Sequence, residues 1–364
     1  MPLPASSSKA EGQIIFPFPF ANLKSQAYTR SDSPIGMEVG MKIHEPPRVH
    51  IAHLPTPLEP LPRLSEQLGG PEIWIKRDDL TDLAFGGNKT RKLEYLVADA
   101  LNQGARTLIT RGARQSNHCR QAAAAAAKFG LDCILVLTGE PAPATEGNLL
   151  LDHLLGAELV WSEGDDPDQV LERAYKQAEA EGRKPSLIPY GGSNAIGASA
   201  YAFAIRELAE QGPAFDRIVF ASSSGGTQAG MIAGVAMEGL KTLVTGISVD
   251  LRAEGLKARI APLLDQIIMK LRLGVDGGSM EIDVRDAYLG GGYGVLGDPE
   301  QEAIERFARL EGVLLDPVYT GRAGAGLDDL VQHGQIKPEE RVLFWHTGGT
   351  PALFAYGDEL LSSS

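Results

Sequence analysis

Hydrophobic positions along the chain switch regularly between the spacing of a strand and that of a helix. Residues 72–80, EIWIKRDDL, alternate apolar and polar side chains as a half-buried strand does, and they end in charges. Further on, Leu93, Leu96 and Val97 share one helical face, and the pattern stops at a glycine. From residue 51 onward, strands and helices are therefore predicted to alternate.

The same alternation continues through the rest of the chain. Apolar runs typical of strands cover residues 106–112, 132–139, 185–192 and 242–250. Helical patterns cover residues 116–130, 166–182, 194–212, 298–312 and 323–334, and residues 147–161 read as a helix followed by a strand. Residues 217–237 read as a strand, a Gly-rich loop and a helix, and residues 341–356 as a strand, a Gly loop and a short helix. Such units predict an α/β fold of mostly parallel, open sheets covered by helices. There are too many units for one small sheet, so we expect two lobes of three layers each, with a ligand between them.

Residues 1–41 differ from the rest of the chain, because they are rich in proline and serine and have few periodic apolar positions. They lack the basic start and apolar block of a secretory signal. An organelle-targeting segment remains open, although the acidic residues weigh against it. We expect a poorly ordered extension, with Met37 or Met41 as alternative starts.

Composition and charge narrow the function classes. The chain has 364 residues, of which 43% are hydrophobic and 22% charged, as in ordinary globular proteins. Its formal net charge of −13 argues against nucleic acid or an anionic membrane surface as a partner. No apolar run is long enough to span a membrane. Cys119 and Cys133 fall in different predicted elements, which favours free thiols in a cytoplasmic protein over a disulfide scaffold.

The loops that follow the predicted strands are rich in Gly, Ser, Thr and Asn and poor in acids. In open α/β sheets, ligands bind beyond the carboxyl ends of the strands, where helix N-termini favour anions. In residues 221–230, ASSSGGTQAG, Gly225 and Gly226 let backbone amides converge, and the hydroxyls of Ser224 and Thr227 add donors. This loop predicts a phosphate-bearing ligand; the alternative is a flexible strand-to-helix turn.

Other motifs are weaker. Residues 292–297, GYGVLG, match G-x-G-x-x-G, but no apolar strand leads into them and the next helix begins after the pattern. Nicotinamide-dinucleotide binding is therefore disfavoured. The sequence has no pair of histidines four residues apart and no Cys-x-x-Cys, so we expect no metal site. His118 lies near a predicted helix start, where a structural and a chemical role are both open.

Lys89 is the most distinctive candidate, because two glycines and an asparagine precede it and a helix follows it. A nucleophilic amine must be partly deprotonated, and Arg91, Lys92 and the positive end of a helix all lower its pKa. A lysine beside a phosphate-binding loop suggests a Schiff base to pyridoxal phosphate. From these residues alone, a solvated surface lysine is the competing interpretation.

Six segments carry a family resemblance, namely residues 75–101, 115–131, 188–201, 223–230, 310–323 and 346–356. They resemble the pyridoxal-phosphate enzymes that include D-cysteine desulfhydrase, aminocyclopropane-carboxylate (ACC) deaminase and L-cysteate sulfo-lyase. The likeness spans residues 48–356. It implies the tryptophan-synthase-β-like fold (fold type II), pyridoxal 5'-phosphate as the cofactor, a small amino acid as the substrate and a homodimer. We expect a large cofactor-binding domain of residues 42–91 and 203–364 and a small domain of residues 92–202.

The resemblance also implies roles for individual residues. Lys89 would carry the cofactor and move the substrate α-proton, and Asn117 would bind the ring hydroxyl. Ser116 and His118 would bind the substrate carboxylate or assist proton transfer. The segment from Ser224 to Thr227, with Gly225 and Gly226, would hold the phosphate together with Lys92. Tyr293 and Tyr319 would approach the substrate side chain.

Two positions separate the branches of this family. ACC deaminases carry a glutamate and a leucine where this chain has Thr320 and Thr347 beside the cofactor. A neutral hydroxyl near the pyridine nitrogen supports a milder electron sink, which is sufficient for β-elimination. We therefore expect D-cysteine desulfhydrase activity, then L-cysteate sulfo-lyase and ACC deaminase. Arg114 would matter for a sulfonate substrate if it faced the site. The other class of function is a non-catalytic phosphate-ligand-binding α/β protein.

Overall fold

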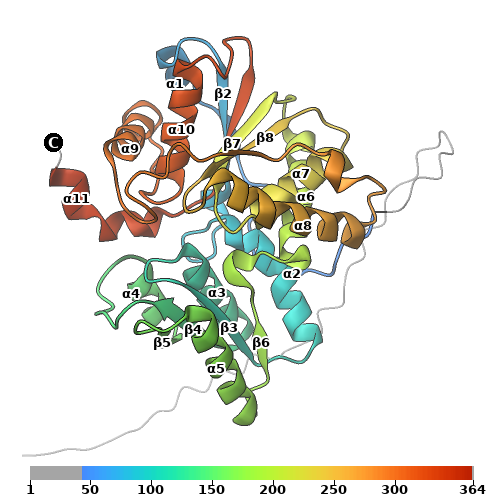
Figure 1. Ribbon diagram of the computed structural model, residues 1–364, viewed down its shortest axis with the longest axis vertical. Coiled ribbons are helices and arrows are strands. Elements are labelled where there is room, and N and C mark those ends of the chain that lie inside the picture. The colour runs from blue at the N-terminus through green and yellow to red at the C-terminus, as the bar shows by residue number, and fades with distance from the viewer. Residues whose placement is uncertain (1–42, 363–364) are drawn as a thin grey trace, which may run out of the picture. The chain divides into compact units, whose positions relative to one another are not determined.

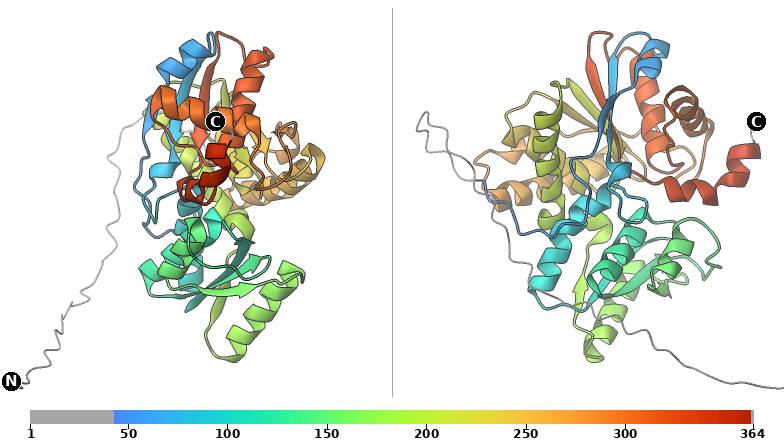
Figure 2. Two further views of the ribbon diagram at one scale, coloured as in Figure 1. Left: turned by 90° about the vertical axis from the view of Figure 1, so that its left-hand side faces the viewer. Right: turned by 180° about the vertical axis from the view of Figure 1, so that it is seen from behind.

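Two β-sheets and their covering helices make up the described part of the chain, residues 43–362 of a computed structural model (Figure 1). The prediction of a poorly ordered extension at residues 1–41 lies outside the described residues. The views in Figure 2 show the four-stranded sheet and its helices as a group separate from the six-stranded sheet.

The larger sheet has six strands. Their order is β1 (Leu58–Pro60), β2 (Glu72–Arg77), β10 (Arg341–His346), β7 (Arg217–Ser222), β8 (Leu243–Ser248) and β9 (Asp283–Arg285). β1 is antiparallel to β2, and all the other neighbours are parallel. In the register, Phe344 of β10 is opposite Ile75 on one side and Val219 on the other. The expected mostly parallel sheet is therefore confirmed, with one antiparallel edge strand.

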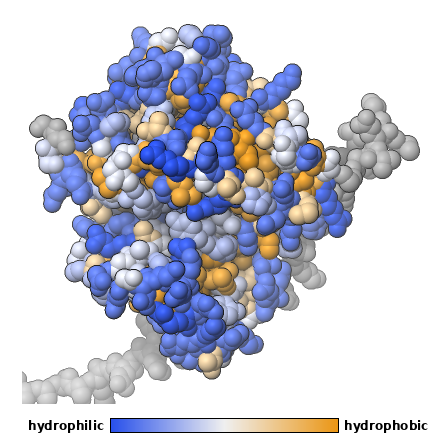
Figure 3. All heavy atoms as spheres, viewed as in Figure 1, coloured by the Kyte–Doolittle hydropathy of each residue, from blue (hydrophilic) through white to orange (hydrophobic). Residues whose placement is uncertain are grey.

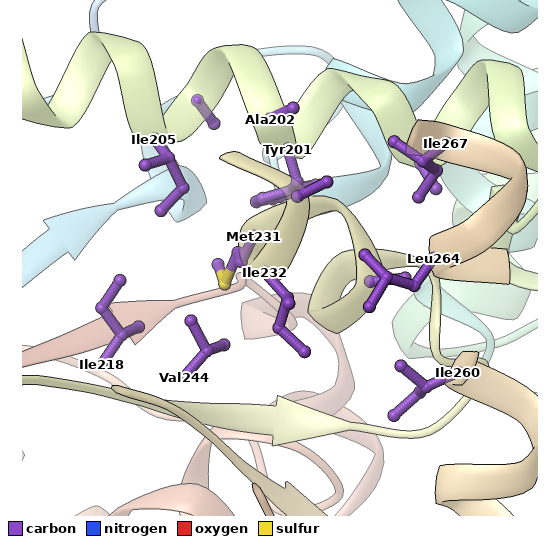
Figure 4. Close-up of a cluster of buried hydrophobic side chains, with 14 of the residues drawn as sticks. Tyr201, Ala202, Ile205, Ile218, Met231, Ile232, Val244, Ile260, Leu264 and Ile267 are labelled. Atoms are coloured by element: carbon purple, nitrogen blue, oxygen red, sulfur yellow. The ribbon is translucent and has the colours of Figure 1, made fainter. Parts of the chain in front are cut away.

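Both faces of this sheet are buried, because side chains of one strand alternate between two cores. Leu343 and Trp345 pack with α6 (Ala195–Gln211), α7 (Gly226–Met237) and α8 (Ala253–Leu271), the cluster drawn in Figure 4. Val342 and Phe344 pack on the other face with α1 (Pro62–Gln67), α9 (Asp298–Glu311) and α10 (Thr320–Gln332). The result is the three-layer arrangement predicted from alternating strand and helix patterns.

The smaller sheet has four parallel strands. Their order is β5 (Glu158–Trp161), β4 (Asp132–Thr138), β3 (Thr107–Ala113) and β6 (Pro185–Leu187). Leu108 and Leu135 point toward α2 (Asn88–Asn102), α3 (Asn117–Phe129) and α4 (Gly147–Leu154). Ile109 and Ile134 point toward α5 (Pro167–Ala180). The short elements η1 (Asp78–Leu80), η2 (Tyr190–Gly192), η3 (Gly277–Ser279), η4 (Thr350–Ala355) and α11 (Gly357–Ser362) complete the fold.

The short elements β1, α1, β9 and α11 were not predicted from the sequence, and two longer helices also depart from the prediction. α8 runs for 19 residues through Pro262 in a region for which no helix was predicted. α10 begins at Thr320 rather than at residue 323, because the Asp316 carboxylate accepts the N–H of Tyr319 and both the N–H and the hydroxyl of Thr320. A side chain outside the periodic segment thus starts this helix.

The smaller sheet lies within residues 92–202, the range predicted for the small domain. The proposed boundary at residue 202 falls inside α6, whose buried face packs with the larger sheet. The two-domain division stays a prediction. None of the helices within residues 43–362 is both long and apolar enough to cross a membrane.

Candidate active site

A pocket forms where the carboxyl ends of β3, β7 and β10 meet the N-termini of α2, α3 and α7. Its empty volume is about 600 Å³, part of which is open solvent. The lining residues are Asn88, Lys89, Ala113, Ser116, Asn117, His118, Tyr190, Gly191, Ala221, Ser222, Ser223, Ser224, Gly225, Thr227, Tyr293, Tyr319 and Thr347. Among them, Lys89 carries the single ammonium or guanidinium group.

Most of the candidate residues from the sequence meet in this pocket. Lys89, Ser116, Asn117, His118, Ser224, Gly225, Thr227, Tyr293, Tyr319 and Thr347 line it, whereas Lys92, Gly226, Thr320 and Arg114 do not. The prediction missed Asn88, Tyr190, Ser222 and Ser223. Each of these lies inside a segment that the sequence analysis singled out, namely residues 75–101, 188–201 and 221–230, so position near the strand ends was the available signal.

Lys89 occupies the second position of α2, and its Nζ lies 3.1 Å from Oδ1 of Asn88. Asn88 in turn donates through Nδ2 to Thr227 of α7 at 3.1 Å. Burial lowers the pKa of Lys89 from 10.5 to about 8. At pH 7 about a tenth of the amine is therefore unprotonated, far more than for an ordinary lysine, as a nucleophile requires.

Two glycines allow the loop before Lys89 to lie against the loop after β10. Gly87 has φ +125° and Gly348 has φ +91°, both in the region that favours glycine. A Cβ on Gly348 would lie 2.6 Å from the Cα of Gly87. Close backbone contact thus joins the loop before α2 to the loop after β10.

The loop between β7 and α7 is suited to an anion. Gly225 has φ +83° and precedes α7, and no side chain caps that helix. Its first backbone N–H groups are therefore available to a ligand. Ser222 Oγ is buried and has no hydrogen-bond partner within the described residues.

Lys92 lies behind the pocket lining rather than in it. Its side chain is fully buried, and Nζ donates to the Gly191 carbonyl at 3.1 Å and to Ser193 Oγ at 3.4 Å. Ser193 Oγ lies 2.8 Å from Ser224 Oγ. Burial and the nearby Lys89 hold the pKa of Lys92 well below its usual range. Lys92 is therefore linked to the loop between β7 and α7 through the hydroxyl of Ser193.

His118 has a defined tautomer. The Thr110 hydroxyl donates to the Ile188 carbonyl at 2.8 Å, so its oxygen accepts from His118 Nε2, which is 2.8 Å away. Burial, Lys89 and Lys92 lower the pKa of His118 well below its usual range, so the ring is neutral. Nδ1 is then an acceptor, buried and unpaired within the described residues.

Three tyrosines also line the pocket. The hydroxyls of Tyr293 and Tyr319 lie 2.6 Å apart, and Tyr190 stacks under the guanidinium of Arg111 at 4.8 Å. Burial raises the pKa of Tyr293 and Tyr319 above the usual value, so both phenols retain their protons at neutral pH.

Thr320 does not reach the pocket surface. Its hydroxyl donates to Asp316 Oδ1 at 2.8 Å, and the side chain is fully buried. The start of α10 thus uses the hydroxyl that the resemblance placed beside the cofactor. Thr347, by contrast, lines the pocket. Arg114 is exposed and also lies outside the lining.

The residues present fit pyridoxal phosphate. An amine with a lowered pKa, an uncapped helix start, the unpaired hydroxyl of Ser222 and the side-chain amide of Asn117 face one pocket. These groups match an aldehyde, a phosphate and a polar ring. No cluster of metal-ligating side chains occurs in residues 43–362.

Comparisons with known proteins agree with this chemistry. The family model described as "Pyridoxal-phosphate dependent enzyme" matches residues 49–348. A D-cysteine desulfhydrase of Yersinia enterocolitica is 44% identical over 329 residues, which cover 88% of this chain and 99% of that protein.

Solved structures show the same fold. The structure of an ACC deaminase homologue is 41% identical, has a TM-score of 0.80, and the match covers 87% of this chain and 96% of that one. A fungal L-serine ammonia-lyase from Rhizomucor miehei is 18% identical with a TM-score of 0.62, and the match covers 85% of this chain and 98% of that one. That second likeness supports the fold alone. The α/β fold of type II expected from the sequence is confirmed, and the chain belongs to the pyridoxal-phosphate dependent enzymes.

Proposed function

We propose that this protein is a D-cysteine desulfhydrase, which eliminates hydrogen sulfide from D-cysteine and, after hydrolysis by one water, yields pyruvate and ammonia. The Yersinia enterocolitica relative of that name matches this chain over 99% of the relative's own length. The single observation that carries the proposal is the composition of the pocket. One reactive amine, Lys89, and two protonated phenols line the same pocket, and no second ammonium or guanidinium group lines it.

The cofactor, when bound, withdraws electrons from the substrate α-carbon. Lys89 would attach it covalently, and the segment from Ser224 to Thr227 would bind its phosphate through backbone N–H groups. Asn117 would donate to the ring oxygen, and Thr347 would lie beside the ring. Gly226 would contribute through the backbone of α7, and Lys92 would act through Ser193.

Protons are moved by residues of the chain itself. Once the substrate has displaced it from the cofactor, the Lys89 amine would take the α-proton, since its lowered pKa leaves part of the free amine neutral. Ser116, at the start of α3, binds the substrate carboxylate, which a helix N-terminus favours. Neutral His118 offers only an acceptor toward the site, so it assists proton transfer rather than binding a carboxylate. Tyr293 or Tyr319 protonates the departing sulfur.

The pocket favours a thiol over a sulfonate. A sulfonate needs several donors or a cation at the leaving group. Arg114, the candidate for that role, is exposed and outside the lining. L-cysteate is therefore the second substrate to test, and Arg114→Ala should leave activity on D-cysteine unchanged. ACC comes third, because Thr347 supplies no charge for the stronger electron sink.

The experiment is a substrate panel on purified holoenzyme. D-cysteine, L-cysteine, L-cysteate, D-serine and ACC are assayed for pyruvate or 2-oxobutyrate and for sulfide or sulfite. We expect sulfide and pyruvate from D-cysteine. Lys89→Ala should lose the covalently bound cofactor band and at least about a thousandfold in kcat, because it removes both nucleophile and base. Lys270→Ala, at an exposed position of α8, is the control. A colourless, inactive wild-type protein would instead support a non-catalytic phosphate-ligand-binding protein.

We also propose a cytoplasmic homodimer. Both cysteines are free and buried, which fits a reducing compartment. The face in Figure 3 is mainly hydrophilic, with groups of hydrophobic residues between. Leu154, Phe354 and Leu361 expose 69%, 72% and 76% of their surface, and a subunit interface would bury side chains of this kind. Light scattering at several concentrations would show a mass near twice 38.8 kDa.

A further inference from the structure

Arg120 of α3 is fully buried directly behind the pocket residue Asn117. Its Nη1 donates to Oδ1 of Asn117 at 3.0 Å and to Oδ1 of Asn148 at 2.5 Å. Its Nη2 donates to the Gly86 carbonyl at 2.7 Å. One guanidinium therefore joins α3, α4 and the loop that leads to Lys89.

These contacts determine which way the Asn117 amide faces. A guanidinium has only donors, so both asparagines must present their oxygen to it. Nδ2 of Asn148 then donates to Oδ1 of Asn117 and to the Gln115 carbonyl, each at 2.9 Å. Asn117 Oδ1 thus accepts from two donors. Its Nδ2 donates to no other residue of the described chain, and it is the group left for a ligand.

We propose that Arg120 and Asn148 are positioning residues, which orient the Asn117 amide so that its NH₂ group faces the cofactor. A flipped amide would place NH₂ against the guanidinium and the Asn148 amide, leaving two buried donors unpaired. The positive charge at the amide oxygen also makes the N–H a stronger donor to an anionic ring oxygen. This inference rests on the cofactor-binding role proposed for Asn117.

Helix α3 also contacts the segment that carries Lys89, and these contacts set the distance between Asn117 and Lys89. Arg120 binds the Gly86 carbonyl, and the neighbouring Gln121 accepts the Thr90 N–H at 2.8 Å while donating to the Asn117 carbonyl at 3.0 Å. Adjacent residues of α3 thus contact the chain on both sides of Lys89. Helix α3 therefore carries the Asn117 amide and also holds the segment that contains the Lys89 amine.

The test compares Asn148→Ala, Arg120→Lys, Asn117→Ala and the double variant Asn117→Ala/Arg120→Lys. Pyridoxal phosphate is removed from each full-length protein and titrated back, which gives its Kd. The pH at which the visible band of the bound cofactor changes is recorded as well. Arg217→Lys, a change to a largely buried arginine of β7 that pairs with Asp283 and Glu340, is the control.

Loss of one hydrogen bond to a charged group corresponds to about tenfold in Kd or more. We expect Asn148→Ala and Arg120→Lys each to weaken cofactor binding by about tenfold and to move the band transition to higher pH, as Asn117→Ala does. In the Asn117→Ala background, Arg120→Lys should add almost nothing, because its effect passes through Asn117. A purely structural role would leave the band transition where it is in the wild type.

Three results would overturn the inference, and they differ from failure of the proposed function. The first is that Asn117→Ala weakens cofactor binding while Asn148→Ala and Arg120→Lys leave the Kd and the band transition unchanged. The second is that the effects of Asn117→Ala and Arg120→Lys on Kd add fully in the double variant. The third is that Asn117→Ala itself has no effect on cofactor binding. If Arg120→Lys does not fold, Asn148→Ala alone and with Asn117→Ala decides the same question. Failure of the proposed function would appear separately, as a holoenzyme that binds the cofactor but releases no sulfide.

Discussion

The hydroxyl oxygens of Tyr293 and Tyr319 lie 2.6 Å apart, and their rings pack edge to face with centroids 5.9 Å apart. Tyr293 comes from the loop after β9, and Tyr319 immediately precedes α10. Only one proton can lie between the two oxygens, so the second phenol is free to donate into the pocket. The pair therefore offers a proton donor in the pocket that Lys89 also lines.

Tyr319→Phe should lower kcat for D-cysteine by about 10²-fold, the usual contribution of a positioned acid. Cofactor affinity and the visible band should stay as in the wild type, because the hydroxyl faces the substrate. Steady-state kinetics with sulfide detection give the result. Tyr175→Phe on α5, far from the pocket, is the control. A loss of cofactor with unchanged kcat would contradict this role.

The reaction of cofactor-free protein with pyridoxal phosphate should follow the neutral fraction of Lys89. Burial lowers the pKa of this amine to about 8, so the rate should rise about tenfold per pH unit below pH 8 and level off above it. Stopped-flow absorbance from pH 6 to pH 9.5 gives the midpoint. A midpoint near the ordinary lysine value would mean that the folded protein does not lower the pKa of Lys89.

Gly348→Ala should reduce the free energy of unfolding by about 2–4 kcal/mol, the combined cost of a strained backbone and an overpacked contact. Its φ is +91°, and the new Cβ would meet backbone of Gly87, which cannot move away as a flexible side chain can. Gly255→Ala is the matched control. It lies in α8 with open space around it, and we expect it to stabilise the protein by about 0.5–1 kcal/mol. Urea unfolding compares the two; equal effects would argue against the close contact between the loops.

Asp152 of α4 is expected to make stability fall as pH rises. The carboxyl group is buried without a hydrogen-bond partner in the described chain, near Arg120, Cys119 and Cys133. Burial raises its pKa from 3.8 to about 8 despite the opposing charge of Arg120. Between these values the folded protein binds the proton more tightly than the unfolded chain does, so the free energy of unfolding decreases with pH.

Asp152→Asn removes this titration and should stabilise the protein most at pH 8 and least at pH 5. The slope for one proton is at most about 1.4 kcal/mol per pH unit. Urea denaturation of both proteins at pH 5, 6, 7 and 8, with equal cofactor saturation, measures the difference. Parallel curves across this range would show that Asp152 is ionised in the folded protein.

The sequence by itself determined the alternation of strands and helices and the loops that line the pocket. Both follow from local rules: hydrophobic spacing reports the period of an element, and glycine, serine and asparagine gather where parallel strands end. Lys89 and Ser224 were found in this way, whereas the role of Asn117 was implied only by the family resemblance. The helix α8 was missed, although its buried face contains Leu256, Ile260 and Leu264.

Only the tertiary structure decided where each side chain points. Lys92 is one helical turn from Lys89, yet it lies behind the lining because it contacts Gly191 and Ser193, about a hundred residues away. Thr320 follows the pocket residue Tyr319 in the chain, yet its hydroxyl donates to Asp316 at the start of α10 and does not line the pocket. The Asn117 amide is oriented by Asn148 from another helix. These directions depend on donors and acceptors brought together by packing between distant elements, and residue spacing along one chain does not contain that information.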